Sequence, residues 1–202
     1  ILDVAAAPVV FTHSSARALT DHPRNVPDDV LRRVKEYDGV VMVTWVPGFV
    51  SEKVRTQGAA KDAEEARLKA LYRGQPEKVK AELARWETAN PAPRATVEDV
   101  ADHIDHVVKV AGPAHAGIGA DLDGITTTPE GLESVAAYPR LFAELVRRGY
   151  TDGELKGIAG RNVLRVMRKA EAVAARLQKE RPASDVRIEE VNKPVAAQPT
   201  AY

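Results

Sequence analysis

The 202-residue chain contains no cysteine. This absence excludes a disulfide framework and a thiolate metal site, so any metal would be held by His, Asp or Glu side chains. The chain also lacks an excess of charge of either sign, because Lys plus Arg and Asp plus Glu total 29 each. A balanced chain creates no overall field that attracts a phosphate backbone or an anionic lipid surface. We therefore predict that neither nucleic acid nor a membrane surface is a partner.

Long apolar runs are missing as well, since no stretch approaches the roughly 20 residues that cross a bilayer. No secretory signal is visible at the start. The chain begins with Ile1 rather than Met, and "ILDVAAAPVV" resembles the end of a helix that leads directly into a strand. We therefore expect an N-terminal truncation, and cytoplasm and periplasm both stay open as the compartment. The 44% of residues that are hydrophobic suffice for the core of one domain.

Three short apolar runs alternate with helical patterns. Residues 9–12, 40–45 and 115–120 are rich in β-branched or small apolar residues, as is typical of buried strands. Between the first two runs, Asn25 and a Pro-Asp-Asp start precede apolar residues at helical spacing, and Gly39 is predicted to end that helix. Strands that alternate with helices over short connections predict a parallel α/β array.

The remaining sequence predicts mostly helix. Residues 51–94 are charged and amphipathic, which indicates a helical insertion on a loop. Two capping boxes, Thr96 with Asp99 and Thr151 with Glu154, are predicted to open later helices. We expect one unit over residues 1–180 and a disordered tail over residues 181–202, which are polar and without period.

Chemically capable side chains stand where the predicted strands end. His13, Trp45 and Asp121 lie at or next to three such ends. In an α/β barrel, catalytic groups come from the C-terminal ends of several strands. His13 is either a site residue or a hydrogen-bonded histidine of the rim, and Trp45 is either core or pocket wall.

Four blocks of sequence resemble one known family. "PVVFTHSSARALTDHPRNVPDDVLRRV" and "VADHIDHVVKVAGPAHAGIGADLDG", together with "GVVMVTWVPGFVS" and "PEGLESVAAYPRLFAELVRRGYTDGELKGIAGRNVLRVM", resemble the C-terminal half of the membrane (renal) dipeptidases, the M19 metallopeptidases. The resemblance covers most of residues 1–170. It implies the C-terminal part of a (β/α)8 TIM-type barrel of the metal-dependent hydrolase kind. It also implies hydrolysis of a dipeptide substrate at a pair of zinc ions bridged by a glutamate.

The resemblance also implies roles for three residues. His13 takes the place of a histidine ligand of the second Zn²⁺, a metal that neutral imidazole suits. Arg24 matches the arginine that holds the free carboxylate of the substrate, although an arginine on a solvated loop or one paired with Asp28 remains an alternative. Asp121 matches an aspartate that passes a proton to the leaving amine.

The family's other metal ligands, a His-x-Asp, the bridging glutamate and a second histidine, are not found in this chain. We therefore expect the chain alone to be inactive. It would form a homo-oligomer or need a missing N-terminal half that completes the barrel.

Other patterns carry weaker signals. His103 and His106 stand three residues apart on a predicted helix, a spacing that can hold a metal, but we interpret them as structural. The stretch "DLDG" suggests calcium, but Ile125 and Thr126 occupy positions where an EF-hand loop needs an oxygen ligand and a glycine. Ser14 and Ser15 lack a nucleophile-elbow pattern and are predicted to donate hydrogen bonds around His13.

Two other functions stay open. The first is a non-catalytic half-barrel that serves as a partner-binding module. The second is a metal-dependent amidohydrolase that acts on a lactone, a phosphotriester or a base amine. Arg24 argues against this second alternative, because those substrates carry no free carboxylate. The preferred dipeptide side chains cannot be predicted from these residues.

Overall fold

The computed structural model describes residues 1–183 and 185–188, so most of the predicted tail lies outside the described residues. Its centre is a three-stranded parallel sheet in the order β1-β2-β3, formed by β1 (Val10–Phe11), β2 (Val40–Val43) and β3 (Ala116–Ile118). Val10 pairs with Val40, and Val41 pairs with Ala116. The predicted α/β class is confirmed, although each strand is shorter than predicted. The described strands form an open sheet, so the TIM-type barrel stays a prediction.

Eight α-helices are described, together with short 3₁₀ segments at Pro113–His115 and Val135–Ala137 and a π-helical turn at Gly157–Arg161. The α-helices are α1 (Asp28–Glu36), α2 (Pro47–Val50), α3 (Glu52–Leu71), α4 (Pro76–Ala89), α5 (Val97–Ala111), α6 (Tyr138–Arg147), α7 (Asp152–Lys156) and α8 (Asn162–Glu180). Both predicted capping boxes are formed, by Thr96 with Asp99 and by Thr151 with Glu154. The π-helical turn divides the predicted last helical stretch into α7 and α8.

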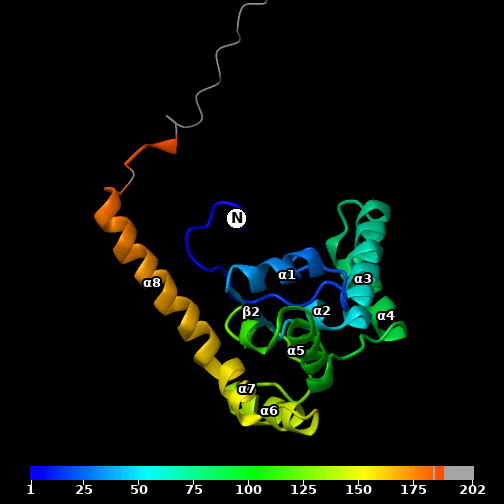
Figure 1. The fold of residues 1–202 in the computed structure, drawn as a ribbon. Helices are drawn as coiled ribbons and strands as arrows, with labels where there is room; N and C mark the ends of the chain where they lie inside the picture. The colour runs from blue at the N-terminus through cyan, green and yellow to red at the C-terminus, as the bar shows by residue number, and fades with distance from the viewer. Residues whose placement is uncertain (184, 189–202) are drawn as a thin grey trace, which may run out of the picture.

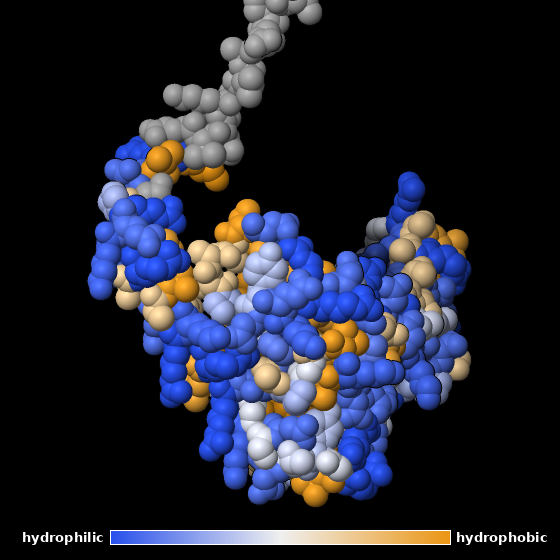
Figure 2. Space-filling view, in the orientation of Figure 1, coloured by the Kyte–Doolittle hydropathy of each residue, from blue (hydrophilic) through white to orange (hydrophobic). Residues whose placement is uncertain are grey.

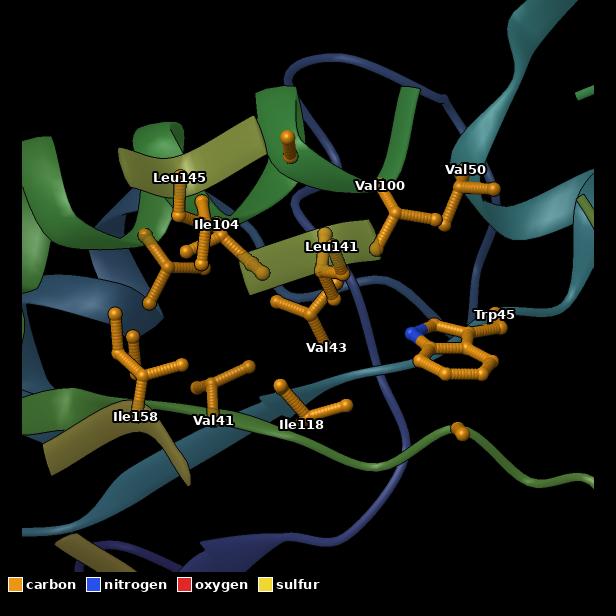
Figure 3. Packing of buried hydrophobic residues seen from close by; sticks show 14 of the residues in the cluster. Val41, Val43, Trp45, Val50, Val100, Ile104, Ile118, Leu141, Leu145 and Ile158 are labelled. Atoms are coloured by element: carbon orange, nitrogen blue, oxygen red, sulfur yellow. The ribbon is translucent and has the colours of Figure 1, made fainter. Parts of the chain in front are cut away.

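The hydrophobic core lies between one face of the sheet and the helices that cover it (Figure 3). Val41 and Val43 alternate with Met42 along β2, as expected for a strand with one face on the core. Trp45 is fully buried in this cluster, with its ring against Tyr138, so core packing is its role in this structure. The helices contribute Leu31, Val34, Val100, Ile104, Val107, Leu141 and Leu145. Burying each such side chain contributes about 1.5–3 kcal/mol.

The turn between α1 and β2 contains Gly39, the residue predicted to end the helix. Its backbone N–H donates to the carbonyl of Val34 at 2.8 Å, and Asp38 takes the left-handed conformation, with φ of 55°. Gly39 also has a second role, because a β-carbon there would lie 2.5 Å from the carbonyl oxygen of Val9. The glycine therefore lets β1 and β2 approach each other.

Two helical parts extend from the central body (Figure 1). Helices α3 and α4 pack against each other within the predicted insertion, and α8 leads away from the sheet. Figure 2 shows apolar surface near the N-terminal segment and along α8, where Ile1, Val4, Leu164 and Met167 are exposed. None of the described helices combines the length and the apolar character needed to cross a membrane.

Candidate active site at the C-terminal ends of the strands

His13 follows β1 directly, and both of its ring nitrogens have partners. The Arg24 guanidinium donates to Nε2 at 2.8 Å, and Thr12 Oγ1 lies 2.8 Å from Nδ1. A guanidinium can only donate, so Nε2 must be the accepting nitrogen. The proton of the neutral ring therefore stands on Nδ1 and is donated to Thr12. This tautomer leaves the Nε2 lone pair free to act as a ligand whenever Arg24 moves away.

Arg24 lies on the loop between β1 and α1, with its side chain exposed. Its guanidinium carbon is 5.6 Å from the centroid of the Phe49 ring, and Phe49 also stacks on His22 at 4.1 Å. Burial, followed by the charge of Arg24, lowers the pKa of His22. The alternative pairing of Arg24 with Asp28 is not formed in this structure; Asp28 instead accepts a hydrogen bond from His106 Nε2 at 2.7 Å. The structure thus brings two predicted site residues, His13 and Arg24, into contact.

Buried side chains fix the loop that carries Arg24. Asn25 accepts from the backbone of Ser15 and donates to the carbonyls of Thr20 and Phe49. The sequence prediction assigned Asn25 only to the start of a helix. Its actual partners lie up to 24 residues away, which no local pattern reveals.

His103 on α5 forms a hydrogen bond with the same loop. Its Nδ1 accepts from the backbone of Ala16 at 2.9 Å, and its Nε2 donates to the carbonyl of Val50 at 3.2 Å. Burial lowers the pKa of His103 to about 4, so the ring is neutral near pH 7. These contacts agree with the predicted structural role for His103 and connect α5 to the loops that follow β1 and β2.

The two serines after His13 do not make the predicted contacts with it. The Ser15 hydroxyl is buried and has no hydrogen-bond partner among the described residues. The hydroxyl that does contact His13 belongs to Thr12, on its other side. Sequence reasoning missed Thr12 because it treated that residue only as the last residue of a strand.

Asp121 stands three residues beyond β3 in a left-handed conformation, with φ of 61°. Aspartate adopts this conformation more readily than most residues, and such backbone often occurs at functional sites. Its carboxylate lies over Gly124, where a β-carbon would be only 2.5 Å from Oδ1. Gly124 also donates a backbone hydrogen bond to the carbonyl of Asp121 at 2.9 Å. This turn therefore braces the loop that carries Asp121.

The ends of β1 and β3 approach each other closely. A β-carbon on Gly119 would overlap the carbonyl oxygen of Thr12, so only glycine allows this contact. Thr12 precedes His13, and Gly119 stands two residues before Asp121. The loops that carry His13 and Asp121 therefore begin close together at the C-terminal ends of the strands.

The described residues supply only part of a metal site. Within residues 1–183 and 185–188, no three His, Asp or Glu side chains are grouped so that they could hold an ion. His13 offers one imidazole nitrogen of the type that zinc binds, whereas a catalytic zinc normally has three protein ligands. The chemistry of His13 thus fits one of the protein ligands of a zinc site.

Comparisons with known proteins identify a family and several relatives of this chain. A family model described as membrane dipeptidase (peptidase family M19) matches residues 1–181. A Schizosaccharomyces pombe protein described as an uncharacterized dipeptidase is 44% identical over 172 residues, which are 84% of this chain and 32% of that protein. The dipeptidase aclJ of Aspergillus oryzae is 37% identical over 185 residues, covering 92% of this chain and 35% of that protein.

Among solved structures, the probable dipeptidase PvdM from Pseudomonas aeruginosa matches with a TM-score of 0.67 and 28% identity. The match covers 85% of this chain and 47% of that one. The chain therefore spans about a third of the length of the sequence relatives and about half of the solved structure.

Proposed function

Because the chain belongs to the membrane dipeptidase family, we propose that it forms part of a zinc-dependent dipeptidase and supplies three residues of its site. The observation that carries this proposal is the family match over residues 1–181, which includes all three strand ends. The contact between His13 and Arg24 supports it, because these residues are 11 positions apart in the sequence and meet at an exposed strand end.

His13 is proposed as a metal ligand through Nε2, with Thr12 holding its other nitrogen. A hydrogen bond to the second nitrogen of a ligating histidine fixes the tautomer and the ring orientation. When bound, zinc would activate a water molecule and polarise the peptide carbonyl. The remaining ligands would come from polypeptide beyond this chain or from a partner copy, within a complete TIM-type barrel.

Arg24 is proposed to bind the free carboxylate of a dipeptide. Its guanidinium offers two parallel donors, which match a carboxylate and select for substrates that end at the second residue. The Nε2 lone pair of His13 cannot accept from Arg24 and bind a metal at once. Arg24 therefore leaves His13 when the site is loaded and becomes available to the substrate.

Asp121 is proposed to hold and transfer the proton that the leaving amine receives. Hydrolysis of a peptide bond needs a proton on the departing nitrogen, and a carboxylate near that nitrogen can relay it from the attacking water. The absence of any side-chain hydrogen bond to Asp121 within the described residues leaves its oxygens available for this task.

The experiment uses the purified complete protein, with the polypeptide or partner copy that supplies the remaining ligands, after treatment with a chelator and with or without added Zn²⁺. We expect hydrolysis of L-Ala-L-Ala only with the metal, and much weaker hydrolysis of the same dipeptide with an amidated C-terminus. As a control, the variant Arg32→Gln should hydrolyse the free and amidated dipeptides as the parent protein does, because Arg32 is exposed on α1 away from the strand ends. Equal rates on the free and amidated dipeptides would contradict the carboxylate-binding role of Arg24. A complete lack of hydrolysis under all conditions would instead favour a non-catalytic, partner-binding module.

A further inference from the structure

A second feature at the same end of the sheet is a cleft of about 490 Å³. Its walls come from the starts of α2 and α3, with Pro47 and Val54, from the segment between α4 and α5 that includes Arg94, and from residues 126–128 in the loop that follows β3. Its size lies within the range of cavities that bind small molecules. None of the three site residues proposed above lines it, so the proposed dipeptidase chemistry does not account for this cleft.

The lining of the cleft combines apolar residues with residues that carry hydrogen-bond donors. Pro47, Val54 and Pro93 are apolar. Arg94 and three consecutive threonines, Thr126 to Thr128, carry the donors. Among the described residues, no carboxylate forms an ion pair with Arg94. A cleft lined by an arginine, three threonines and apolar residues offers hydrogen-bond donors that match an anionic group, above all a carboxylate, attached to a short apolar stem.

The rim of the cleft is held by backbone contacts. Glu130 donates its backbone N–H to the carbonyl of Ala95 at 2.7 Å, and Thr96 and Glu130 form an isolated parallel bridge. The carboxylate of Glu133, which lies in the same region, accepts from the backbone of Gly131 at 2.7 Å. The segment next to Arg94 is thus joined to the threonine loop. The backbone holds the Glu133 carboxylate, and backbone hydrogen bonds lower its pKa first, with smaller contributions from the charges of Arg140 and Arg94.

Residues that line the cleft are close in sequence to the ends of the strands that carry the candidate active site. Thr126 follows Asp121 by five residues, and Pro47 follows the end of β2 by four. We propose that this cleft binds an acidic side chain of the dipeptide, so that the enzyme prefers substrates containing Glu or Asp. This inference rests on the proposed function and adds a substrate class to it.

The test compares isosteric substrates that differ only in charge. The values of kcat/KM are measured for L-Ala-L-Glu against L-Ala-L-Gln, and for L-Glu-L-Ala against L-Gln-L-Ala, with the zinc-loaded protein. We expect the parent protein to prefer the acidic member of at least one pair by about tenfold, as for one charge-assisted hydrogen-bonded contact. Arg94→Gln should abolish this preference and leave activity on the neutral dipeptides unchanged, and Arg94→Lys should retain part of it. Arg32→Gln is the matched control.

A second measurement separates this inference from the proposed function. Binding of glutarate to the parent protein and to Arg94→Gln is followed by calorimetry, which requires no turnover. If dipeptides are hydrolysed but the acidic preference is absent, or survives in Arg94→Gln, the cleft assignment is wrong and the dipeptidase proposal stands. If no dipeptide is hydrolysed, the proposed function fails. Glutarate binding that is lost in Arg94→Gln would then still support the carboxylate specificity of the cleft, and no glutarate binding would overturn it.

Discussion

The two ends of the parallel strands differ in how their polar groups are satisfied. At the N-terminal end, Asp38 forms ion pairs with Arg165 and Lys169 of α8. There also, Asn162 donates to the carbonyls of Pro113 and Ala116, both at 2.8 Å. At the C-terminal end, His13 and Arg24 contact mainly each other, and the Asp121 carboxylate is held only by the tight turn at Gly124.

This difference indicates that the N-terminal ends of the strands contribute to stability and the C-terminal ends to ligand binding. Polar groups whose partners are all inside the protein stabilise the fold, because leaving any of them unpaired would be costly. Polar groups that are held in place by the backbone but lack strong internal partners are available to a ligand. Alpha/beta folds commonly use the C-terminal ends of strands for chemistry and the opposite ends for stability. Mutations at the two ends should therefore affect different measurable quantities.

The largest effect is expected from Asp121→Asn at the C-terminal end. Loss of a group that transfers a proton commonly lowers kcat by about 10² to 10⁴. The fold should survive, because asparagine also accepts the left-handed backbone conformation of this position. Steady-state kinetics and the thermal midpoint of unfolding, Tm, measure the two effects separately. Full activity in Asp121→Asn would remove this residue from the mechanism, and Asp123→Asn serves as the neighbouring control.

Acid should lower the free energy of unfolding through His103, the buried histidine that connects α5 to the loops after β1 and β2. The pKa of His103 is about 4 in the folded protein and about 6.5 in the unfolded chain, so the unfolded chain takes up the proton first. The stabilisation from the neutral ring is complete above pH 6.5 and is lost as the pH falls toward 4. The total loss is roughly 3 kcal/mol. Urea unfolding at several pH values measures it.

The variant His103→Asn isolates this contribution. Its side-chain oxygen can still accept from Ala16, but it cannot gain a proton in this range. We expect the variant to be less stable at pH 7 and to lose less further stability between pH 6.5 and 4. Identical pH profiles for parent and variant would show that His103 is not the group that titrates.

At the N-terminal end, Asn162→Ala should reduce stability without changing chemistry. The substitution removes two hydrogen bonds and leaves two carbonyl groups without these partners, at a cost of about 2 kcal/mol. Because Asn162 is distant from the candidate site, kcat and KM of the folded protein should stay unchanged. Asn90→Ala is a matched control, since Asn90 is exposed at the end of α4. A fall in kcat for Asn162→Ala would break the proposed division between the two ends.

The sequence predicted features formed by residues close in sequence better than contacts between residues that lie far apart in sequence. The capping boxes at Thr96 and Thr151 were predicted because each is complete within four residues. The contacts of Asn25 and His103 were not predicted, because their partners lie on other elements. Gly39 was assigned to a helix end, and the close approach of Val9 also requires it, a constraint that exists only once the strands pair. The roles of His13, Arg24 and Asp121 came from family resemblance, and they stay predictions.

The smallest of these effects is expected from Arg24→Lys, which tests whether Arg24 at the C-terminal end of the strands binds the substrate carboxylate. Lysine keeps the positive charge but replaces a planar pair of donors with a single ammonium group, so it cannot bind a carboxylate in the same two-point manner. We expect KM for dipeptides to rise about tenfold, which corresponds to about 1.4 kcal/mol, while kcat changes little. Arg17→Lys on the same loop is the control, because Arg17 already pairs with Asp21 at 2.8 Å. The KM of an amidated dipeptide should not respond to Arg24→Lys, because its carboxylate is absent. If the KM values of the free and amidated dipeptides rose equally, Arg24 would be acting through the loop or through His13 rather than on the substrate carboxylate.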